Sequence, residues 1–261
     1  TVEDVEKIAA SVGKKPASAV VIGGGFIGVE IAENLIHRKV PTALVEATHQ
    51  VLMPLDPELA TLVAKEMRSH GVDLRLGASV VKINSDSVEL SNGEVLPAEI
   101  VILAIGVRPE IGLAKAAGLE IGSRNGIKVD EFNRTSNHDI YAVGDVSGRI
   151  ALVNMGEIEA RHAVEKIFGN KKERLSYDNI CTIMFLNPEV AAVGLNEQNC
   201  VEQNIPVKVV KVDYSVIARA IAMRKTKGFF KIIVTNDNDM RILGMRAVGE
   251  HASTAIEAIG L

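Results

Sequence analysis

The sequence predicts an α/β fold with two kinds of sheet. In the N-terminal part, an apolar strand over 18–23 is followed by a helix and a second apolar strand over 41–46, which is typical of parallel strands crossed by helices. After about residue 175 the pattern changes to short strands separated by polar turns, which indicates an α+β region with an antiparallel sheet. The 261 residues, 47% of them hydrophobic, suffice for two medium domains.

Each N-terminal element has a local reason. Residues 1–15 are predicted to form a short amphipathic helix and a linker. A helix over 25–38 follows the first strand, with apolar residues on one side. The next helix begins at Asp56-Pro57, an acidic N-cap followed by proline at the first position, and it ends near Gly71 before a strand over 72–76.

A hairpin and one more strand complete this domain. Residues 78–97 alternate and turn at Ser91-Asn92-Gly93, which is a strong hairpin signal. The continuous apolar run Ile100–Ile105 predicts a strand buried on both faces. Gly106 follows the carboxyl end of that strand, where ligands bind in open α/β sheets, so Gly106 is a candidate site residue.

Two further blocks follow. In the first, a strand over 140–143 leads into Gly144 and Asp145, and a helix over 156–169 comes next. In the second, the apolar strands over 182–185 and 190–193 are expected to need a partner surface beyond one small sheet. The predicted domains are a linker at 1–15, a first domain at 16–118, a middle segment at 119–174 and a C-terminal domain at 175–261.

The first strand runs directly into a glycine-rich turn. Gly23, Gly25 and Gly28 have the spacing G-x-G-x-x-G. The first glycine permits a tight turn, the second lets the backbone approach a pyrophosphate, and the third lets the helix pack on the strand. Phe26 and Ile27 open the helix, whose N–H groups and positive dipole end favour phosphate. The loop is therefore a candidate dinucleotide site.

A carboxylate stands where such a site needs one. Glu46 ends the second strand, about 20 residues after the loop, and can accept hydrogen bonds from the ribose hydroxyls of NAD. A carboxylate there repels a 2′-phosphate, which favours NAD over NADP. The alternative is a glycine-rich turn that serves only packing, and this alternative leaves Glu46 unexplained.

The composition excludes several classes of function. A formal net charge of −4 and 3% aromatic residues argue against nucleic-acid binding. No apolar run approaches the ~20 residues of a membrane span. The two cysteines, Cys181 and Cys200, cannot form a disulfide framework and indicate a reducing, cytoplasmic setting. The six histidines are scattered, so no metal site is predicted.

Four motifs occur in order along the chain: Gly23–Glu30, Ala104–Pro109, Ile140–Asp145 and Asn187–Leu195. Together they resemble the FAD-dependent pyridine nucleotide–disulfide oxidoreductases, and the resemblance covers essentially the whole chain. The C-terminal block, with Gly249–Ser253, is similar to the dihydrolipoamide dehydrogenase branch. The segment Leu55–Leu59 is more similar to the NADH oxidase and coenzyme A disulfide reductase branch.

The resemblance implies a role for each domain. The first would be a Rossmann-like NAD-binding domain, the middle segment the returning part of an FAD domain, and the last a dimerisation domain that forms a homodimer. Glu30 would lie on the nicotinamide side, and Gly144 and Asp145 would form a turn that contacts FAD. The complete enzyme would transfer a hydride between NAD(H) and FAD, coupled to a small-molecule thiol/disulfide substrate.

The chain departs from the family pattern at both ends. It has no FAD domain with its own glycine motif and no C-x-x-x-x-C pair, and Cys181 and Cys200 are too far apart to be that pair. The acid–base histidine segment of the dihydrolipoamide dehydrogenase branch is also missing, and His251 does not replace it. We therefore expect a C-terminal fragment without catalytic residues that is inactive by itself. A non-catalytic NAD-binding and dimerisation module is the alternative function.

Overall fold

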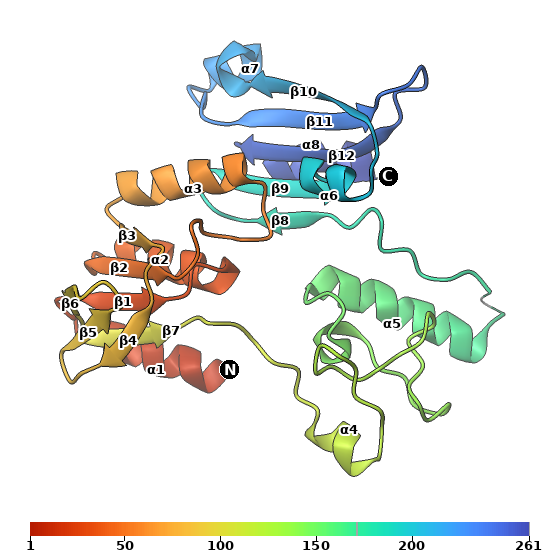
Figure 1. Cartoon of the computed structure of the whole chain (residues 1–261), viewed down its shortest axis with the longest axis horizontal. Coiled ribbons are helices and arrows are strands. Elements are labelled where there is room, and N and C mark those ends of the chain that lie inside the picture. The colour runs from red at the N-terminus through yellow and green to blue at the C-terminus, as the bar shows by residue number, and fades with distance from the viewer. Residues whose placement is uncertain (171, 261) are drawn as a thin grey trace. The chain divides into compact units, whose positions relative to one another are not determined.

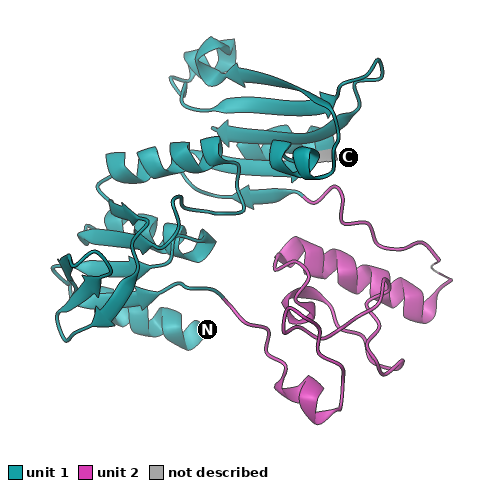
Figure 2. Ribbon diagram, in the orientation of Figure 1, with its two compact units in different colours: residues 1–106, 181–261 teal, residues 107–180 magenta. Residues whose placement is uncertain are grey.

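A computed structural model describes residues 1–170 and 172–260, which form two compact units (Figures 1 and 2). The first unit combines residues 1–106 with the chain from 181 onward, and the second comprises 107–180. The first and last parts of the sequence therefore fold together, while the middle segment folds by itself. The domain boundaries at 118 and 174 stay predictions.

A parallel sheet with the strand order β3-β2-β1-β7 forms one part of the first unit. Helix α2 connects β1 to β2, and helix α3 connects β2 to β3, which confirms the predicted alternation of strands and helices. The elements are α1 (Val2–Gly13), β1 (Ala19–Ile22), α2 (Phe26–His37), β2 (Thr42–Glu46), α3 (Pro57–Ser69), β3 (Asp73–Leu76) and β7 (Ile100–Leu103).

A small antiparallel sheet, in the order β4-β5-β6, lies between β3 and β7 in the sequence. The predicted hairpin turn is confirmed: Gly93 has φ +87°, and its N–H donates to the carbonyl of Leu90 at 2.9 Å. Alternation along the parallel strands divides their side chains between two cores, so Val21 belongs to the main core and Val20 packs with the small sheet. The strands are β4 (Val80–Ile83), β5 (Ser87–Leu90) and β6 (Val95–Pro97).

Strand β7 is shorter and more exposed than predicted. The sequence suggested a strand over Ile100–Ile105 that is buried on both faces, but the strand ends at Leu103. Ile102 is buried, whereas Leu103 and Ile105 are 61% and 74% exposed. The reason is topological, because β7 is the edge of the parallel sheet and only β1 pairs with it among the described strands.

The C-terminal part of the first unit is a five-stranded antiparallel sheet in the order β10-β11-β12-β9-β8, as the sequence predicted. Its elements are β8 (Thr182–Met184), β9 (Glu189–Gly194), α6 (Glu197–Glu202), β10 (Val207–Asp213), the 3₁₀ turn η2 (Tyr214–Val216), α7 (Ala218–Ala222), β11 (Phe229–Thr235), β12 (Ile242–Gly249) and α8 (Ala252–Gly260).

Parts of both faces of this sheet are covered within the chain. On one face, α8 packs through Ala252 and Ile256 against Ala191 and Val193 of β9. On the other face, residues of β8, β9, β11 and β12 join the main core, which also contains the apolar side of α3. Helices α3 and α8 cover much of β9, but Phe185, which directly follows β8, is 76% exposed, so the need of these strands for a further partner surface stays a prediction.

The second unit has little regular structure. It contains α4 (Gly112–Ala116), the 3₁₀ turn η1 (Gly144–Ser147) and α5 (Val153–Phe168) around a small core. The predicted strand over 140–143 is wrong. Across the described part of this unit the chain forms only isolated bridges, one of them between Arg134 and Tyr141, because no neighbouring segment offers a longer row of backbone partners.

A group of charged side chains lies where α3 meets the antiparallel sheet, and Asp56, Lys231 and Arg246 of this group are buried. Lys231 of β11 is 2% exposed, and its Nζ lies 2.5 Å from Glu58 Oε1 and 2.7 Å from Glu197 Oε2. Arg246 of β12 donates from Nε to Asp56 Oδ2 at 2.6 Å. Burial by itself lowers the pKa of Lys231, but the carboxylates of Glu197 and Glu58 outweigh it and raise that pKa above its ordinary value.

Replacement of Lys231 by methionine preserves the length of the side chain and removes its charge. We expect the free energy of unfolding to fall by about 2–3 kcal/mol, because Glu58, Glu197 and the buried Asp56 lose a shared cation. Urea denaturation measures the change.

Lys227→Met is the matched control. Lys227 is 67% exposed and pairs with Glu66, so its loss should cost less than about 1 kcal/mol. Equal losses for the two variants would contradict a special role for the buried lysine.

Candidate functional site

The glycine-rich loop follows the end of β1, and steric constraints explain two of its glycines. Gly23 has φ +107°, and a Cβ there would overlap the backbone carbonyl of Ala104. A Cβ on Gly28 would overlap the carbonyl oxygen of Gly23. Helix α2 therefore approaches the loop more closely than any residue with a side chain would allow.

The space beside Gly25 is open. A Cβ built on this residue would meet no atom within 4 Å. Gly25 is the N-cap of α2 and forms no side-chain cap, while Phe26 and Ile27 at the start of the helix are 37% and 48% exposed. A helix N-terminus with open space in front of it fits an anionic group such as a pyrophosphate.

Glu46 lies against this loop. Its Oε2 accepts from the N–H of Gly24 at 2.6 Å, and its Oε1 accepts from the N–H of Thr48 at 2.7 Å. Burial alone would raise the pKa of the carboxyl, but the hydrogen bonds from Thr48 and Gly24 reverse this effect and hold the pKa below its ordinary value. The carboxylate is therefore ionised at neutral pH and retains lone pairs for a ligand.

The sign of this shift gives a pH dependence. A depressed folded-state pKa means that Glu46 contributes to stability above its unfolded-state pKa of 4.5. The contribution is lost as the pH falls through the folded-state value. At pH 6–8 the charge of this side chain is constant.

Two other predicted residues belong to the same unit. Gly106 has φ +116° and is exposed, and it follows Ala104, the residue that packs against Gly23. Glu30 is exposed on α2 and lines an open groove together with Ile8 and Val12 of α1. The structure thus gathers the glycine loop, Glu46 and the end of β7 at the carboxyl edge of the parallel sheet.

Gly144 and Asp145 lie in the second unit, at the start of η1. Gly144 has φ +71°, and its N–H donates to Oε2 of Glu159 at 2.6 Å. Glu159 of α5 is completely buried, and its Oε1 accepts from the hydroxyl of Tyr177 at 2.8 Å. Asp145 itself is exposed. The buried Glu159 thus holds the turn in place, and the carboxylate of Asp145 is accessible.

Sequence reasoning missed the supporting contacts of both turns. Glu159 and Tyr177 belong to no recognisable sequence motif. The hydrogen bond between Gly24 and Glu46 joins residues that are far apart in the sequence. Asp56 was predicted as the N-cap of α3, and it has that position, but its side chain binds Arg246 and makes no capping hydrogen bond.

The two cysteines both lie in the first unit. Both are free, and burial raises the pKa of each thiol. Cys200 is buried, whereas Cys181 is half-buried and immediately precedes β8. Within residues 1–170 and 172–260, no cluster of His, Cys, Asp and Glu could hold a metal ion, and no helix is long and apolar enough to cross a membrane.

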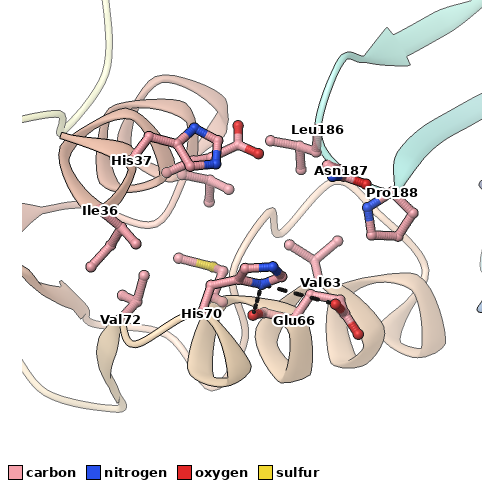
Figure 3. Close-up of a pocket in the computed structure, with 12 residues that line it drawn as sticks. Ile36, His37, Val63, Glu66, His70, Val72, Leu186, Asn187 and Pro188 are labelled. Atoms are coloured by element: carbon pink, nitrogen blue, oxygen red, sulfur yellow. Dashed lines mark hydrogen bonds and ion pairs between the residues drawn. The ribbon is translucent and has the colours of Figure 1, made fainter. Parts of the chain in front are cut away.

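A separate pocket of about 60 Å³ lies between α2, α3 and the segment 186–188 (Figure 3). His37 and His70 line it from the two helices, and Nδ1 of His70 is 2.9 Å from the carbonyl oxygen of Glu66. None of the predicted site residues lines this pocket. It is therefore distinct from the glycine loop.

Alanine substitutions separate the two roles of the glycines. Gly28→Ala should lower the free energy of unfolding by about 1–3 kcal/mol, because its methyl group overlaps the backbone of Gly23. Gly25→Ala should cost about 1 kcal/mol or less, since its surroundings are open and its φ of −74° suits any residue. Urea denaturation of both variants tests this, and a fully stable Gly28→Ala protein would contradict the close packing.

Comparison with known proteins agrees with this architecture. Residues 1–160 match the family described as pyridine nucleotide-disulphide oxidoreductase, and residues 180–261 match its dimerisation domain. A dihydrolipoyl dehydrogenase of Chlamydia muridarum is 35% identical over 252 residues, which cover 94% of this chain and 54% of that protein. The chain spans about half the length of the curated relatives that it matches.

Solved structures give the same result. The reduced CoADR-RHD protein of Bacillus anthracis aligns with a TM-score of 0.83 and 34% identity, over 99% of this chain and 50% of that one. An NAD-dependent persulfide reductase from A. fulgidus aligns with a TM-score of 0.84 and 28% identity, over 100% of this chain and 51% of that one. The chain therefore belongs to the pyridine nucleotide-disulphide oxidoreductase family.

Proposed function

We propose that this chain is the NAD-binding and dimerisation part of an NAD(H)-linked flavoprotein oxidoreductase. The complete enzyme transfers a hydride between NAD(H) and FAD and couples this transfer to a small-molecule thiol/disulfide substrate. The observation that carries the proposal is the open, uncapped start of α2 at Gly25, next to the ionised carboxylate of Glu46. The persulfide reductase and dihydrolipoyl dehydrogenase relatives support it.

In this proposal the chain's own residues bind and orient NAD. Gly25 and the N-terminal N–H groups of α2, at Phe26 and Ile27, would hold the pyrophosphate. Glu46 accepts from the ribose hydroxyls, while Glu30 and Gly106 border the nicotinamide end. Bound NAD(H) supplies or accepts the hydride.

The FAD contact in this proposal comes from the second unit. Asp145, whose carboxylate is exposed, would contact the flavin nucleotide, and Glu159 keeps the turn in place by accepting a hydrogen bond from the Gly144 N–H. One turn offers few contacts, so the isolated chain is proposed to lack both tightly bound flavin and turnover. The raised thiol pKa values of Cys181 and Cys200 are consistent with the absence of a catalytic thiol in this part.

The protein is further proposed to act as a cytoplasmic homodimer. The match of residues 180–261 to the family's dimerisation domain supports the dimer. The edge strand β10 has an outward apolar surface, with Val210 and Val212 60% and 40% exposed. The two free cysteines support a reducing compartment.

The chain should bind NADH at least about tenfold more tightly than NADPH, because Glu46 is charged and repels a 2′-phosphate. Titration calorimetry with both cofactors measures the ratio. Glu46→Gln removes the charge and should narrow this ratio.

The matched control is Glu99→Gln. Glu99 also accepts a backbone N–H, that of Ala17 at 2.9 Å, but it lies at the opposite end of the parallel sheet. The Glu99→Gln variant should leave the ratio of NADH to NADPH affinity unchanged. An equal or higher affinity of the unaltered chain for NADPH would refute the role of Glu46.

The chain should sediment as a dimer at micromolar concentration. Stable interfaces of this class bury about 2,000 Å² or more, and residues 180–261, which match the family's dimerisation domain, are the part of the chain proposed to form the interface. Sedimentation velocity over a concentration series tests this. If the chain is a monomer at every concentration of the series, the proposed dimer is refuted.

A further inference from the structure

We propose that Asp56 is a positioning residue for the dinucleotide loop and that it couples the antiparallel sheet to Gly24. The connection is the segment 47–55, which runs from Glu46 to the start of α3. This inference rests on the proposed function only where it concerns NAD affinity. The structural coupling depends only on contacts within the first unit.

Gly24 is held from both of its backbone polar groups. Its N–H donates to Oε2 of Glu46 at 2.6 Å, and its carbonyl accepts from the N–H of Leu52 at 2.8 Å. The peptide groups on both sides of Gly24 are thus fixed by the strand end and by the segment that follows it. Gly24 immediately precedes Gly25, where the pyrophosphate is proposed to bind.

Leu52 has an unusual backbone conformation. Its φ is +54°, and its side chain is only 1% exposed. The left-handed region costs a bulky residue on the order of 1–2 kcal/mol, so the surrounding structure must hold Leu52 there. Its carbonyl accepts from the N–H of Leu55 at 2.7 Å, which closes a tight turn before Asp56.

Asp56 anchors the other end of this turn. Its Oδ2 accepts from Nε of Arg246 at 2.6 Å, and the carboxylate is 1% exposed. Arg246 is itself fixed, because its guanidinium also donates to the carbonyls of Val193 and Met245 at 2.8 and 2.9 Å. The carboxylate of Asp56 therefore ties the turn to β9 and β12.

The two anchors are close in the sequence. Only Met53, Pro54 and Leu55 separate the Leu52 amide from Asp56. A shift of Asp56 relative to Arg246 would move the strained turn and with it the hydrogen bond to the Gly24 carbonyl. By linkage, a ligand that orders Gly24 must also act on the Asp56–Arg246 pair.

The test uses two serine variants of the full chain. Asp56→Ser retains a good N-cap residue but cannot reach Arg246. Glu58→Ser is the matched control, because it removes one carboxylate from the same charged group and the same first turn but does not touch Arg246. The measurements are the backbone amide resonance of Gly24 by NMR and the dissociation constant of NADH.

We expect Asp56→Ser to shift the Gly24 resonance and to raise the dissociation constant of NADH about tenfold. Glu58→Ser should leave the Gly24 resonance unshifted and the dissociation constant of NADH within about twofold, although it lowers the free energy of unfolding. If the two variants behave alike in both measurements, the positioning role of Asp56 is overturned.

Two further outcomes distinguish failure of the coupling from failure of the proposed function. If the unaltered chain does not bind NADH, the proposed function fails, and the Gly24 resonance alone decides the coupling. If Asp56→Ser does not fold, the coupling is tested on the unaltered chain. Binding of NADH should then shift the Nε–H resonance of Arg246. An unshifted Arg246 resonance at saturating NADH overturns the proposal.

Discussion

Burial of α3 on two sides is the constraint on which the first unit depends. Leu59, Val63 and Met67 of this helix share one core with residues of β1 and β2 and with residues of β8, β9 and β12. Each fully buried aliphatic side chain contributes on the order of 1.5–3 kcal/mol. Because a single helix serves both sheets, the N-terminal and C-terminal parts of the sequence form one compact unit although the middle segment separates them.

Hydrophobic burial is not directional, so it holds α3 in place without fixing its alignment. The buried charges at the start of the helix are directional. Asp56, Lys231 and Arg246 are each at most 6% exposed, and removal of these groups from water is costly unless they meet in one particular geometry. The same pairs that align α3 with the sheet also fix the end of the segment that contacts Gly24.

The two candidate binding turns are built on one principle in two separately folded units. In each, a glycine N–H donates to a carboxylate from a neighbouring element: Gly24 to Glu46, and Gly144 to Glu159. Charge-assisted hydrogen bonds of this kind are short and strong, and they fix a turn before a ligand arrives. Pre-organised backbone groups lower the entropic cost of binding.

The amino-acid sequence is sufficient to predict the features that depend on short-range sterics and periodicity. It predicted the strand–loop–helix unit, the hairpin at Gly93 and the antiparallel C-terminal sheet, and the spacing of Gly23, Gly25 and Gly28 indicated the loop. Only the tertiary structure decided which polar groups meet across long sequence distances, such as Asp56 with Arg246 and Glu159 with Gly144. It also decided that β7 ends at the exposed Leu103 and that 140–143 is no strand. The physical reason is that burial and pairing depend on neighbours supplied by distant segments, and no local pattern encodes those neighbours.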